Sequence, residues 1–318
     1  MKKYIKNKKI IVTGGTGSIG SEIVRRLLKF DVGQVRVYSR DENKQYQLIQ
    51  ELGRDKRLKF FIGDVRDKER MDMAFDEADI CFHAAALKQV PLCEYNPFEA
   101  VKTNIIGTQN VIDLAIKHNL EKVIAISTDK AADPSSVMGA SKLMMEKLIT
   151  AAEYIRGKSN TKFAAVRFGN VLNSRGSVIP LWIEQIKKGG PITVTNPKMT
   201  RFFMDTSKAV DLVFKTAELM QGGEIFVLKM DKINIMDLAK KIIKKHSPKK
   251  EISIKIIGIR PGEKLYEKLL TEDELQHALE TDEMFILLPW AEAFHAAIKS
   301  QKYPYARVTK LKEYRSNM

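Results

Sequence analysis

Short apolar runs alternate with amphipathic stretches along the first half of the chain. Strands are predicted where apolar and β-branched residues cluster, and helices where apolar residues recur every three or four positions. The predicted strands are Lys9–Thr13, Gln34–Tyr38, Lys59–Gly63, Ala78–Ala84, Lys122–Ser127 and Phe163–Phe168, and helices are predicted from Ile19 to Leu28, Gln45 to Leu52, Phe98 to His118 and Ser136 to Tyr154. Such alternation is typical of βαβ units. The sequence therefore predicts an α/β fold with a Rossmann-type, doubly wound parallel sheet.

The pattern becomes less regular after residue 175. Helices are predicted at Ile179–Lys188, Thr206–Met220 and Ile235–Lys245, with short strands near Ile192–Val194, Ile225–Val227 and Ile252–Ile257. We expect residues 1–175 to form the Rossmann domain, and residues 176–290 to form mainly a smaller C-terminal lobe that is interleaved with it, shares its core and binds substrate. Residues 291–318 form a helical or irregular tail whose role the sequence does not indicate.

Composition places the chain among ordinary globular proteins. Of its 318 residues 44% are hydrophobic and 29% charged, and the formal charge is 54 − 39 = +15. The positive charge favours an acidic partner, or is simply a lysine-rich surface. Cys81 and Cys93 do not suggest a disulfide framework or a metal site. Since no apolar run approaches the roughly 20 residues that span a bilayer, we expect a cytoplasmic protein without a membrane span.

A glycine motif follows the first predicted strand. Gly14, Gly17 and Gly20 form G-x-x-G-x-x-G, with Thr16, Ser18 and Ile19 between them, at the start of a predicted helix. Such glycines let the backbone approach a pyrophosphate, whose charge is stabilised by the helix N-terminus. The strand before and the helix after make a dinucleotide site the expected function of this motif.

The residues after the next strands indicate which dinucleotide binds. The second strand ends in Ser39-Arg40-Asp41, where an acidic residue would select NAD. Ser39 and Arg40 favour the 2′-phosphate of NADP, although Arg40 is also a plausible surface residue and Asp41 a plausible ribose ligand. The other expected cofactor contacts are Lys44, Asp64 and Val65 near the adenine, Ala84, Ala85, Ala86 and Lys88. Asn104 is expected to open a helix turn, to hold a water or to be purely structural.

A polar cluster marks the expected reaction site. Ser127-Thr128-Asp129-Lys130 emerges at the carboxyl end of the fifth strand, where open α/β sheets bind ligands. Met138 and Lys142 follow on one face of the next helix. Ordinary short-chain dehydrogenases/reductases carry Tyr and Lys at these two positions, and methionine cannot exchange a proton. We expect Lys142 to orient the nicotinamide ribose, while the alternatives are a solvated Lys142 and a loop ion pair between Asp129 and Lys130.

Several ordered blocks carry a resemblance to a known family. They are Thr13–Gly20, Ser39–Glu42, His83–Lys88, Ser127–Ala131, Arg167–Val171 and Arg260–Leu265. Together they resemble the UDP-N-acetylglucosamine 4,6-dehydratases of polysaccharide and flagellin-sugar biosynthesis, which are extended short-chain dehydrogenases/reductases. The resemblance spans about residues 5–290. Related sugar-nucleotide dehydratases carry Thr-Asp-Glu where this chain has Thr128-Asp129-Lys130, so Lys130 would replace the base.

The resemblance implies a reaction and a role for each residue. Hydride leaves sugar carbon 4 for tightly bound NADP⁺, water is eliminated across carbons 5 and 6, and the hydride returns to carbon 6, which regenerates the cofactor. Lys130 would be the base at carbon 5 and Asp129 the acid for the departing hydroxyl. We expect Lys142 and the nicotinamide to lower the pKa of Lys130. Asp129 is the preferred first acceptor of the carbon 4 hydroxyl proton, with Thr128 or water as alternatives.

The expected substrate contacts and the competing functions complete the prediction. The contacts are Lys88, Asn170, Asn173, Val178, Arg201, Arg260 and Glu263. The substrate would be a nucleotide sugar and the protein a homo-oligomer, with no metal and no nucleic acid.

One alternative is an epimerase of the same superfamily, although epimerases usually need the missing Tyr. Another is a non-catalytic NADP sensor or nucleic-acid-binding relative, which Met138 and the positive charge suggest. Many retaining relatives carry membrane spans, and none is predicted in this sequence, so inversion at carbon 5 is the favoured expectation.

Overall fold

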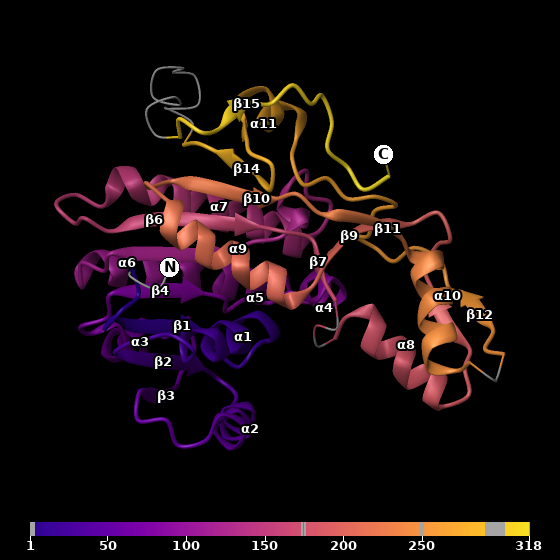
Figure 1. Cartoon of the computed structure of the whole chain (residues 1–318), viewed down its shortest axis with the longest axis horizontal. Coiled ribbons are helices and arrows are strands. Elements are labelled where there is room, and N and C mark those ends of the chain that lie inside the picture. Colours follow the sequence, from indigo (N-terminus) through magenta and orange to yellow (C-terminus); the bar gives the residue numbers. More distant parts are fainter. Residues whose placement is uncertain (1–3, 173, 175, 249–250, 290–302, 318) are drawn as a thin grey trace.

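The structure, a computed structural model, describes residues 4–172, 174, 176–248, 251–289 and 303–317. A large twisted sheet with flanking helices forms its centre (Figure 1). In the described residues its strands, in spatial order, are β15 (Arg307–Val308), β13 (Leu279–Glu280), β14 (Met284–Leu287), β10 (Glu224–Leu228), β6 (Lys162–Arg167), β5 (Lys122–Ile126), β4 (Ile80–His83), β1 (Lys9–Thr13), β2 (Gln34–Ser39) and β3 (Leu58–Ile62).

Seven neighbouring strands, from β3 to β10, are parallel, whereas β14, β13 and β15 continue the sheet in antiparallel pairs. The strand order reverses at β1, which pairs on one side with β2 and on the other with β4. Chain segments that leave β1 and β4 diverge at this point and open a crevice at the carboxyl ends of the strands. The predicted Rossmann-type α/β fold is confirmed.

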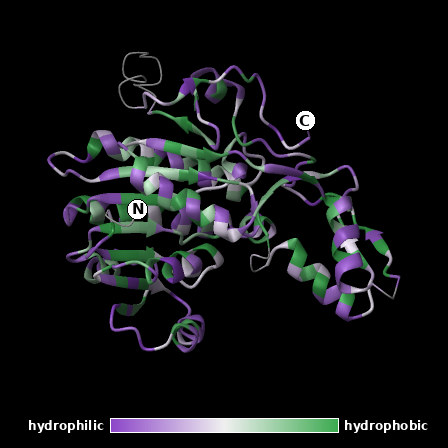
Figure 2. Ribbon diagram, viewed as in Figure 1, coloured by the Kyte–Doolittle hydropathy of each residue, from purple (hydrophilic) through white to green (hydrophobic). Residues whose placement is uncertain are grey.

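Helices cover the sheet in two packed groups. α1 (Ser18–Leu27) contacts α9 (Thr206–Leu219), and α6 (Gly107–Lys117) contacts both α3 (Lys68–Phe75) and α7 (Val137–Ile155). The central strands are almost wholly buried and hydrophobic, as the green ribbons of Figure 2 show. Strands covered on both faces need apolar residues at every position, which explains their continuous apolar runs.

A smaller lobe stands beside the sheet (right in Figure 1). It contains α8 (Val178–Lys187), β8 (Ile192–Val194), α10 (Ile235–His246) and β12 (Ile254–Ile256), and a three-stranded sheet of β7 (Asn170–Val171), β9 (Thr200–Met204) and β11 (Asp231–Asn234) lies at its base. Trp182, Ile192 and Leu238 belong to an apolar cluster of its own. α9, β10 and β14 pack instead into the core of the large sheet. The lobe therefore has a separate small core, and the chain returns from it to the main sheet.

The helix predicted for Phe98–His118 is observed as one uninterrupted helical segment that contains a π-helical turn. After α4 (Val90–Tyr95), the segment consists of α5 (Pro97–Ala100), the π-helical turn (Val101–Ile106) and α6. The side chain of Asn104, in the π-turn, accepts a hydrogen bond from Leu87 N and donates to Leu87 O and to Ser141 Oγ. These bonds give Asn104 a structural role, and they tie the loop after β4 to α7.

Shorter elements complete the described fold. They are α2 (Glu42–Leu52), a 3₁₀ turn (Asp129–Ala131) and α11 (Glu272–His277). The tail predicted to be helical or irregular contributes β15 to the edge of the large sheet, so that prediction is wrong at Arg307 and Val308. In the described part of the chain, no helix combines the length and apolarity needed to cross a bilayer.

Candidate active site

The glycine motif forms the turn between β1 and α1. Gly14 has φ +64°, and a Cβ atom there would lie 2.7 Å from Ala85 N. A Cβ atom at Gly20 would lie 2.3 Å from Gly14 O. Gly17 is the N-cap of α1, offers no side chain to the helix, and is followed by no acidic residue in the first turn. The positive end of α1 is therefore shaped to receive an anionic group.

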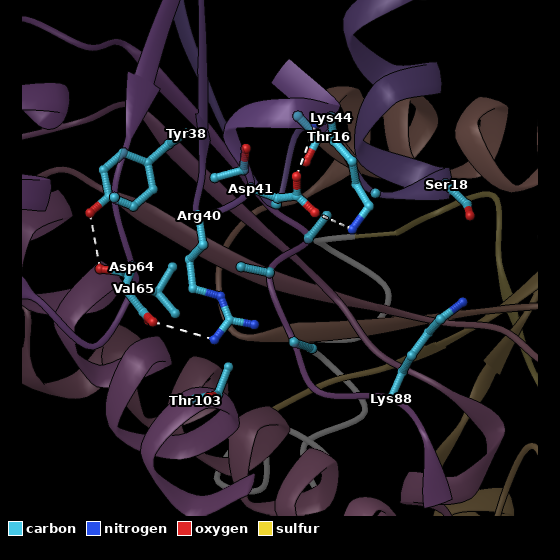
Figure 3. A pocket seen from close by; sticks show the side chains of 17 residues that line it. Thr16, Ser18, Tyr38, Arg40, Asp41, Lys44, Asp64, Val65, Lys88 and Thr103 are labelled. Atoms are coloured by element: carbon cyan, nitrogen blue, oxygen red, sulfur yellow. Dashed lines mark hydrogen bonds and ion pairs between the residues drawn. The ribbon is translucent and has the colours of Figure 1, made fainter. Parts of the chain in front are cut away.

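A groove runs from this turn across the ends of β2 and β3 (Figure 3). It is lined by most of the predicted cofactor residues, namely Gly14, Thr16, Gly17, Ser18, Ser39, Arg40, Asp41, Lys44, Asp64, Val65, Ala84, Ala85, Ala86 and Lys88. Ile19, Gly20 and Lys142 line the neighbouring cleft instead. The two depressions share Gly17, Ser18, Ala84, Ala86 and Lys88, so they form one continuous site.

The end of the groove beside β2 carries most of its charged groups. The Arg40 side chain is 53% exposed and its Nη1 lies 3.4 Å from Asp64 Oδ2. Asp41 is the N-cap of α2 and accepts a hydrogen bond from Lys44 N. Ser39 Oγ accepts one from Gln45 Nε2 at 3.0 Å. Arg40 thus presents a cationic fork at the groove, while the Asp41 carboxylate is already engaged by its own helix.

Thr103 also lines this groove, and the sequence analysis did not select it. The residue is 4% exposed and its Oγ1 is buried without a hydrogen-bond partner. Buried hydroxyls normally have a partner, so an unpaired one at a groove wall points to a ligand that supplies it. Three features of the groove therefore fit a dinucleotide: the glycine turn, the N-terminus of α1 and the unpaired Thr103 hydroxyl.

The second depression is a cleft of about 430 Å³ between the large sheet and the lobe. From the sheet side come Ser127, Thr128 and Lys130 at the end of β5, and Met138 and Lys142 from α7. From the lobe side come Asn170, Ser177 and Val178. Ser127 and Ser177 each have a buried Oγ without a hydrogen-bond partner, which again indicates a place for a polar ligand.

Asp129 and Lys130, which the sequence predicts as acid and base, form an ion pair. Lys130 Nζ lies 3.0 Å from Asp129 Oδ1, which also accepts a hydrogen bond from Thr128 Oγ1 at 2.9 Å. Asp129 is fully buried, and its Oδ2 has no partner. The structure thus brings Thr128, Asp129 and Lys130 together, although Lys130 and Thr128 line the cleft and Asp129 lies behind them.

The pKa of Lys130 corrects one prediction. Burial lowers it, but the carboxylates of Asp129 and Glu267 outweigh burial and raise the pKa above its ordinary value. A lowered pKa was predicted from Lys142 and the nicotinamide alone, whereas folding also brings the Glu267 carboxylate to 3.4 Å from Lys130 Nζ. In the protein without ligands, Lys130 is therefore an ammonium ion at neutral pH.

Lys142 and Met138 face the same cleft from α7. Lys142 Nζ donates to Ile126 O at 2.5 Å, and burial lowers the pKa of Lys142 to about 8. Met138 is 4% exposed and packs in a small cluster with Cys93 and Ala100. Met138 therefore fills space between the core and the cleft.

The remaining predicted substrate residues lie in different places. Asn173 lies outside the described residues. Arg201, Arg260 and Glu263 are not among the residues that line the groove or the cleft. Arg201 is buried and its guanidinium donates to the carbonyl oxygens of Thr200, Leu265 and Lys264. Arg260 Nη1 lies 3.7 Å from Glu263 Oε1 on an exposed loop.

Comparison with known proteins identifies the family. The chain matches the family described as polysaccharide biosynthesis protein over residues 10–289. An uncharacterized membrane protein of Methanocaldococcus jannaschii is 55% identical over 292 residues, which cover 90% of this chain and 87% of that protein. A UDP-glucose 4-epimerase of Rickettsia rickettsii is 46% identical and covers 86% of this chain and 80% of its own. An inverting UDP-N-acetylglucosamine 4,6-dehydratase of Campylobacter jejuni is 42% identical, with 89% and 83% covered.

Solved structures agree with this assignment. The X-ray structure of Pen from Bacillus thuringiensis superposes with a TM-score of 0.91 and 43% identity, covering 99% of this chain and 95% of that one. DesIV from Streptomyces venezuelae, a dTDP-glucose 4,6-dehydratase with NAD and TYD bound, gives a TM-score of 0.72 at 21% identity, covering 81% and 86%. The second likeness supports the fold alone. By sequence and fold, the chain belongs to the polysaccharide biosynthesis protein family, within the extended short-chain dehydrogenases/reductases.

Proposed function

We propose that this protein is a nucleotide-sugar 4,6-dehydratase that converts UDP-N-acetylglucosamine to a UDP-4-keto-6-deoxy-N-acetylhexosamine for surface polysaccharide or glycan synthesis. The Asp129–Lys130 contact of 3.0 Å beside the cleft carries the proposal. Met138 stands where related reductases have a tyrosine, and it cannot exchange protons. An elimination needs both an acid and a base, and this pair supplies one of each. The 42% identity to the Campylobacter dehydratase agrees with this assignment.

The groove would hold NADP⁺, which when bound supplies temporary storage for a hydride between sugar carbons 4 and 6. The α1 N-terminus at Gly17 would bind the pyrophosphate. Arg40, with Ser39 and Lys44, would bind the 2′-phosphate, because the Asp41 carboxylate already caps α2. Thr103, Asp64 and Val65 would border the adenine.

We assign the proton-transfer steps of the reaction to Asp129 and Lys130. Asp129, linked to the cleft through the Thr128 hydroxyl, would accept the carbon 4 hydroxyl proton and pass it to the departing carbon 6 hydroxyl, which leaves as water. Lys130 would remove the carbon 5 proton, and a proton from solvent would be added to carbon 5 as the hydride returns to carbon 6. Lys130 must first lose its own proton. Its side chain is 22% exposed, so this proton can pass to solvent before the substrate fills the cleft. Lys142 would orient the ribose from α7.

Substrate contacts are proposed mainly within the cleft. Lys88, Asn170 and Val178 line it, and Ser177 adds an unpaired hydroxyl at the start of α8. Arg260 and Glu263 stay proposed contacts from the exposed loop. We assign Arg201 no substrate contact, because backbone carbonyls already occupy its guanidinium.

One reaction in deuterated water tests the function. UDP-N-acetylglucosamine, enzyme and catalytic NADP⁺ should give a 4-keto-6-deoxy product that has lost one water, with solvent deuterium at carbon 5. NMR of that product reports the configuration at carbon 5, which we propose is inverted. Absence of the product, with substrate recovered unchanged, would reject the proposal.

An epimerase is the second candidate, because the Rickettsia epimerase is 46% identical to this chain. Epimerisation conserves mass, whereas dehydration removes one water. Mass spectrometry of the same mixture therefore separates the two reactions.

We also propose a homo-oligomer. Leu92, Tyr95 and Phe98, on α4 and α5, are exposed by 62%, 85% and 62%. Burial of such an apolar surface against a second copy would be favourable. Light scattering after size-exclusion chromatography should give a multiple of 36.2 kDa, and a single monomeric mass would reject this proposal.

A further inference from the structure

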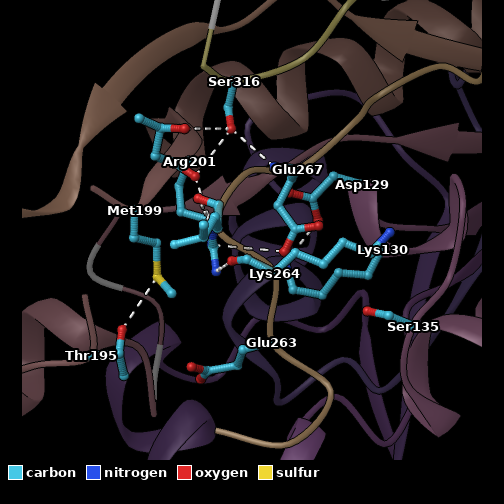
Figure 4. Close-up of polar contacts among 12 residues, drawn as sticks. Asp129, Lys130, Ser135, Thr195, Met199, Arg201, Glu263, Lys264, Glu267 and Ser316 are labelled. Carbon is cyan, nitrogen blue, oxygen red and sulfur yellow. Dashed lines mark hydrogen bonds and ion pairs between the residues drawn. The ribbon is translucent and has the colours of Figure 1, made fainter. Parts of the chain in front are cut away.

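A second carboxylate, that of Glu267, contacts Lys130 behind the cleft (Figure 4). Its Oε1 lies 3.4 Å from Lys130 Nζ, and the residue is only 3% exposed. Glu267 does not line the cleft, and its carboxylate contacts the cleft lining at Lys130. Asp129 also accepts a hydrogen bond from the cleft-lining Thr128 hydroxyl, whereas Glu267 would act on the reaction through Lys130.

Glu267 belongs to a compact set of four charges. Asp129 and Glu267 are the anions, and Lys130 and Arg201 are the cations. Arg201 Nε lies 3.7 Å from the same Oε1 atom that faces Lys130. Hydrogen bonds to backbone carbonyls fix the Arg201 guanidinium, so the Glu267 carboxylate is held between Arg201 and the Lys130 amine. Buried charges are tolerated when they are paired in this way.

The backbone of Glu267 is fixed by the end of the chain. Glu267 N donates to Ser316 Oγ at 3.0 Å, and Ser316 N donates to Glu267 O at 2.9 Å. Ser316 Oγ also donates to Thr200 O at 3.0 Å. Two residues earlier, the Tyr314 ring stacks on Phe202 at 5.3 Å. These contacts of the C-terminal segment therefore hold Glu267 next to β9, the strand that carries Arg201.

We propose that Glu267 is a positioning residue that holds the Lys130 amine against Asp129 and controls its charge, and that the C-terminal segment at Ser316 holds Glu267 in place. The catalytic meaning of this inference rests on the proposed dehydratase function, whereas its electrostatic content does not. Lys130 can accept the carbon 5 proton only as a neutral amine. Glu267 stabilises the ammonium form, so it sets the pH at which the base becomes available.

The charged groups around Lys130 fix the sign of the effect. Asp129, Glu267 and Arg201 act on it most strongly, and Lys142 and Lys88 line the same cleft. Replacing Glu267 by Gln removes one of the two neighbouring anions and leaves the cations in place. The pKa of Lys130 should then fall by about one unit or more, as expected for loss of an opposite charge within a few ångströms.

The direct test is NMR titration of the Lys130 side chain in the protein without substrate. Lysine is labelled with ¹³C and ¹⁵N, and the resonance is assigned by its loss in Lys130→Arg. Glu267→Gln should titrate at least about one pH unit below wild type. Glu283→Gln is the matched control, because it breaks only the exposed ion pair with Lys215, and it should titrate as wild type does. Equal titration of Glu267→Gln and wild type would overturn the inference.

Glu267→Asp serves if Glu267→Gln does not fold. It keeps the charge but withdraws the carboxylate by one methylene, so a smaller fall in the same direction is expected, and no fall would count against the inference. The pH profile of kcat/KM, which reports the groups of the free enzyme, gives the catalytic readout: the acidic limb of Glu267→Gln should move to lower pH by the amount measured by NMR. If wild type forms no dehydrated product, the proposed function fails, yet the titration still decides the role of Glu267.

Discussion

Lys130 Nζ lies 3.0 Å from Asp129 Oδ1, while the second oxygen of that carboxylate is buried without a partner. One oxygen of Asp129 is therefore committed to Lys130, and the other remains available. In the proposed function, this carboxylate would both orient Lys130 and exchange a proton with the substrate.

Lys130→Ala should abolish dehydration and leave cofactor binding intact, because Lys130 lines the cleft and not the dinucleotide groove. Loss of a general base costs about 10²–10⁴-fold in rate. Product formation and NADP⁺ titration by fluorescence measure the two effects. Lys215→Ala, which alters an exposed ion pair, is the control. A fully active Lys130→Ala enzyme would refute the assigned role.

Met138→Ala should reduce stability more than catalysis. Met138 packs with Cys93 and Ala100, so truncation should lower the free energy of unfolding by about 2–5 kcal/mol. Urea denaturation measures this change, and kcat should fall by less than about tenfold. If turnover disappears while the unfolding curve stays that of wild type, Met138 has a chemical role that we have not assigned.

Arg40→Ala should weaken NADP⁺ binding by about ten- to a hundredfold, because it removes a charge-assisted contact to the 2′-phosphate. NAD⁺ affinity should change little. Calorimetric titration with both dinucleotides measures the ratio, and Arg54→Ala, at an exposed position outside the groove lining, is the control. Equal losses for both dinucleotides would show that Arg40 does not select the phosphate.

Gly14→Ala should destabilise the protein by at least about 2 kcal/mol and abolish cofactor binding. The new Cβ would meet Ala85 N at 2.7 Å in a backbone with φ +64°. Gly53→Ala isolates the backbone effect, since Gly53 has φ +72° but no atom within 4 Å of the added Cβ. Thermal denaturation should therefore show a smaller loss for Gly53→Ala. Equal losses would mean that contact with the loop after β4 is unimportant.

The buried amine of Lys142 predicts a pH-dependent stability. Its pKa is lowered from 10.5 to about 8 in the folded protein, so below pH 8 folding carries the full cost of burying a cation. Between pH 8 and 10.5 the unfolded chain binds more protons, and stability should rise relative to Lys142→Met by up to about 3 kcal/mol. Urea denaturation at pH 7 and pH 10 measures the difference. Parallel pH curves for the two proteins would contradict the shift.

The sequence predicted the main strands because a buried parallel strand needs a continuous apolar run. Lys9–Thr13 and Ile192–Val194 were predicted with their observed bounds. β7, β9, β11, β13, β14 and β15 were not predicted. Each has only two to five residues, so the pattern of apolar positions is too short to identify it. The helix Phe98–His118 was predicted, but not its π-helical turn, where the Asn104 side chain bonds to Leu87 in a distant loop.

The site residues that lie at the ends of strands could be predicted from the sequence. Gly14, Arg40, Asp64, Ala84 and Lys130 all lie next to the carboxyl ends of parallel strands, and those ends converge in any doubly wound sheet. Ser127 belongs to the predicted polar cluster but was assigned no role, and Thr103 carried no local signal.

The sequence by itself determined the α/β fold, the glycine turn at the groove and the pairing of Asp129 with Lys130, since each depends on residues close in the chain or on strand order. Only the tertiary structure decided the charge of Lys130. Glu267 lies far from Lys130 along the chain, is held by Ser316 from the C-terminal segment, and reaches Lys130 through folding alone. A pKa depends on every charge within a few ångströms, and a sequence does not state which distant charges those are.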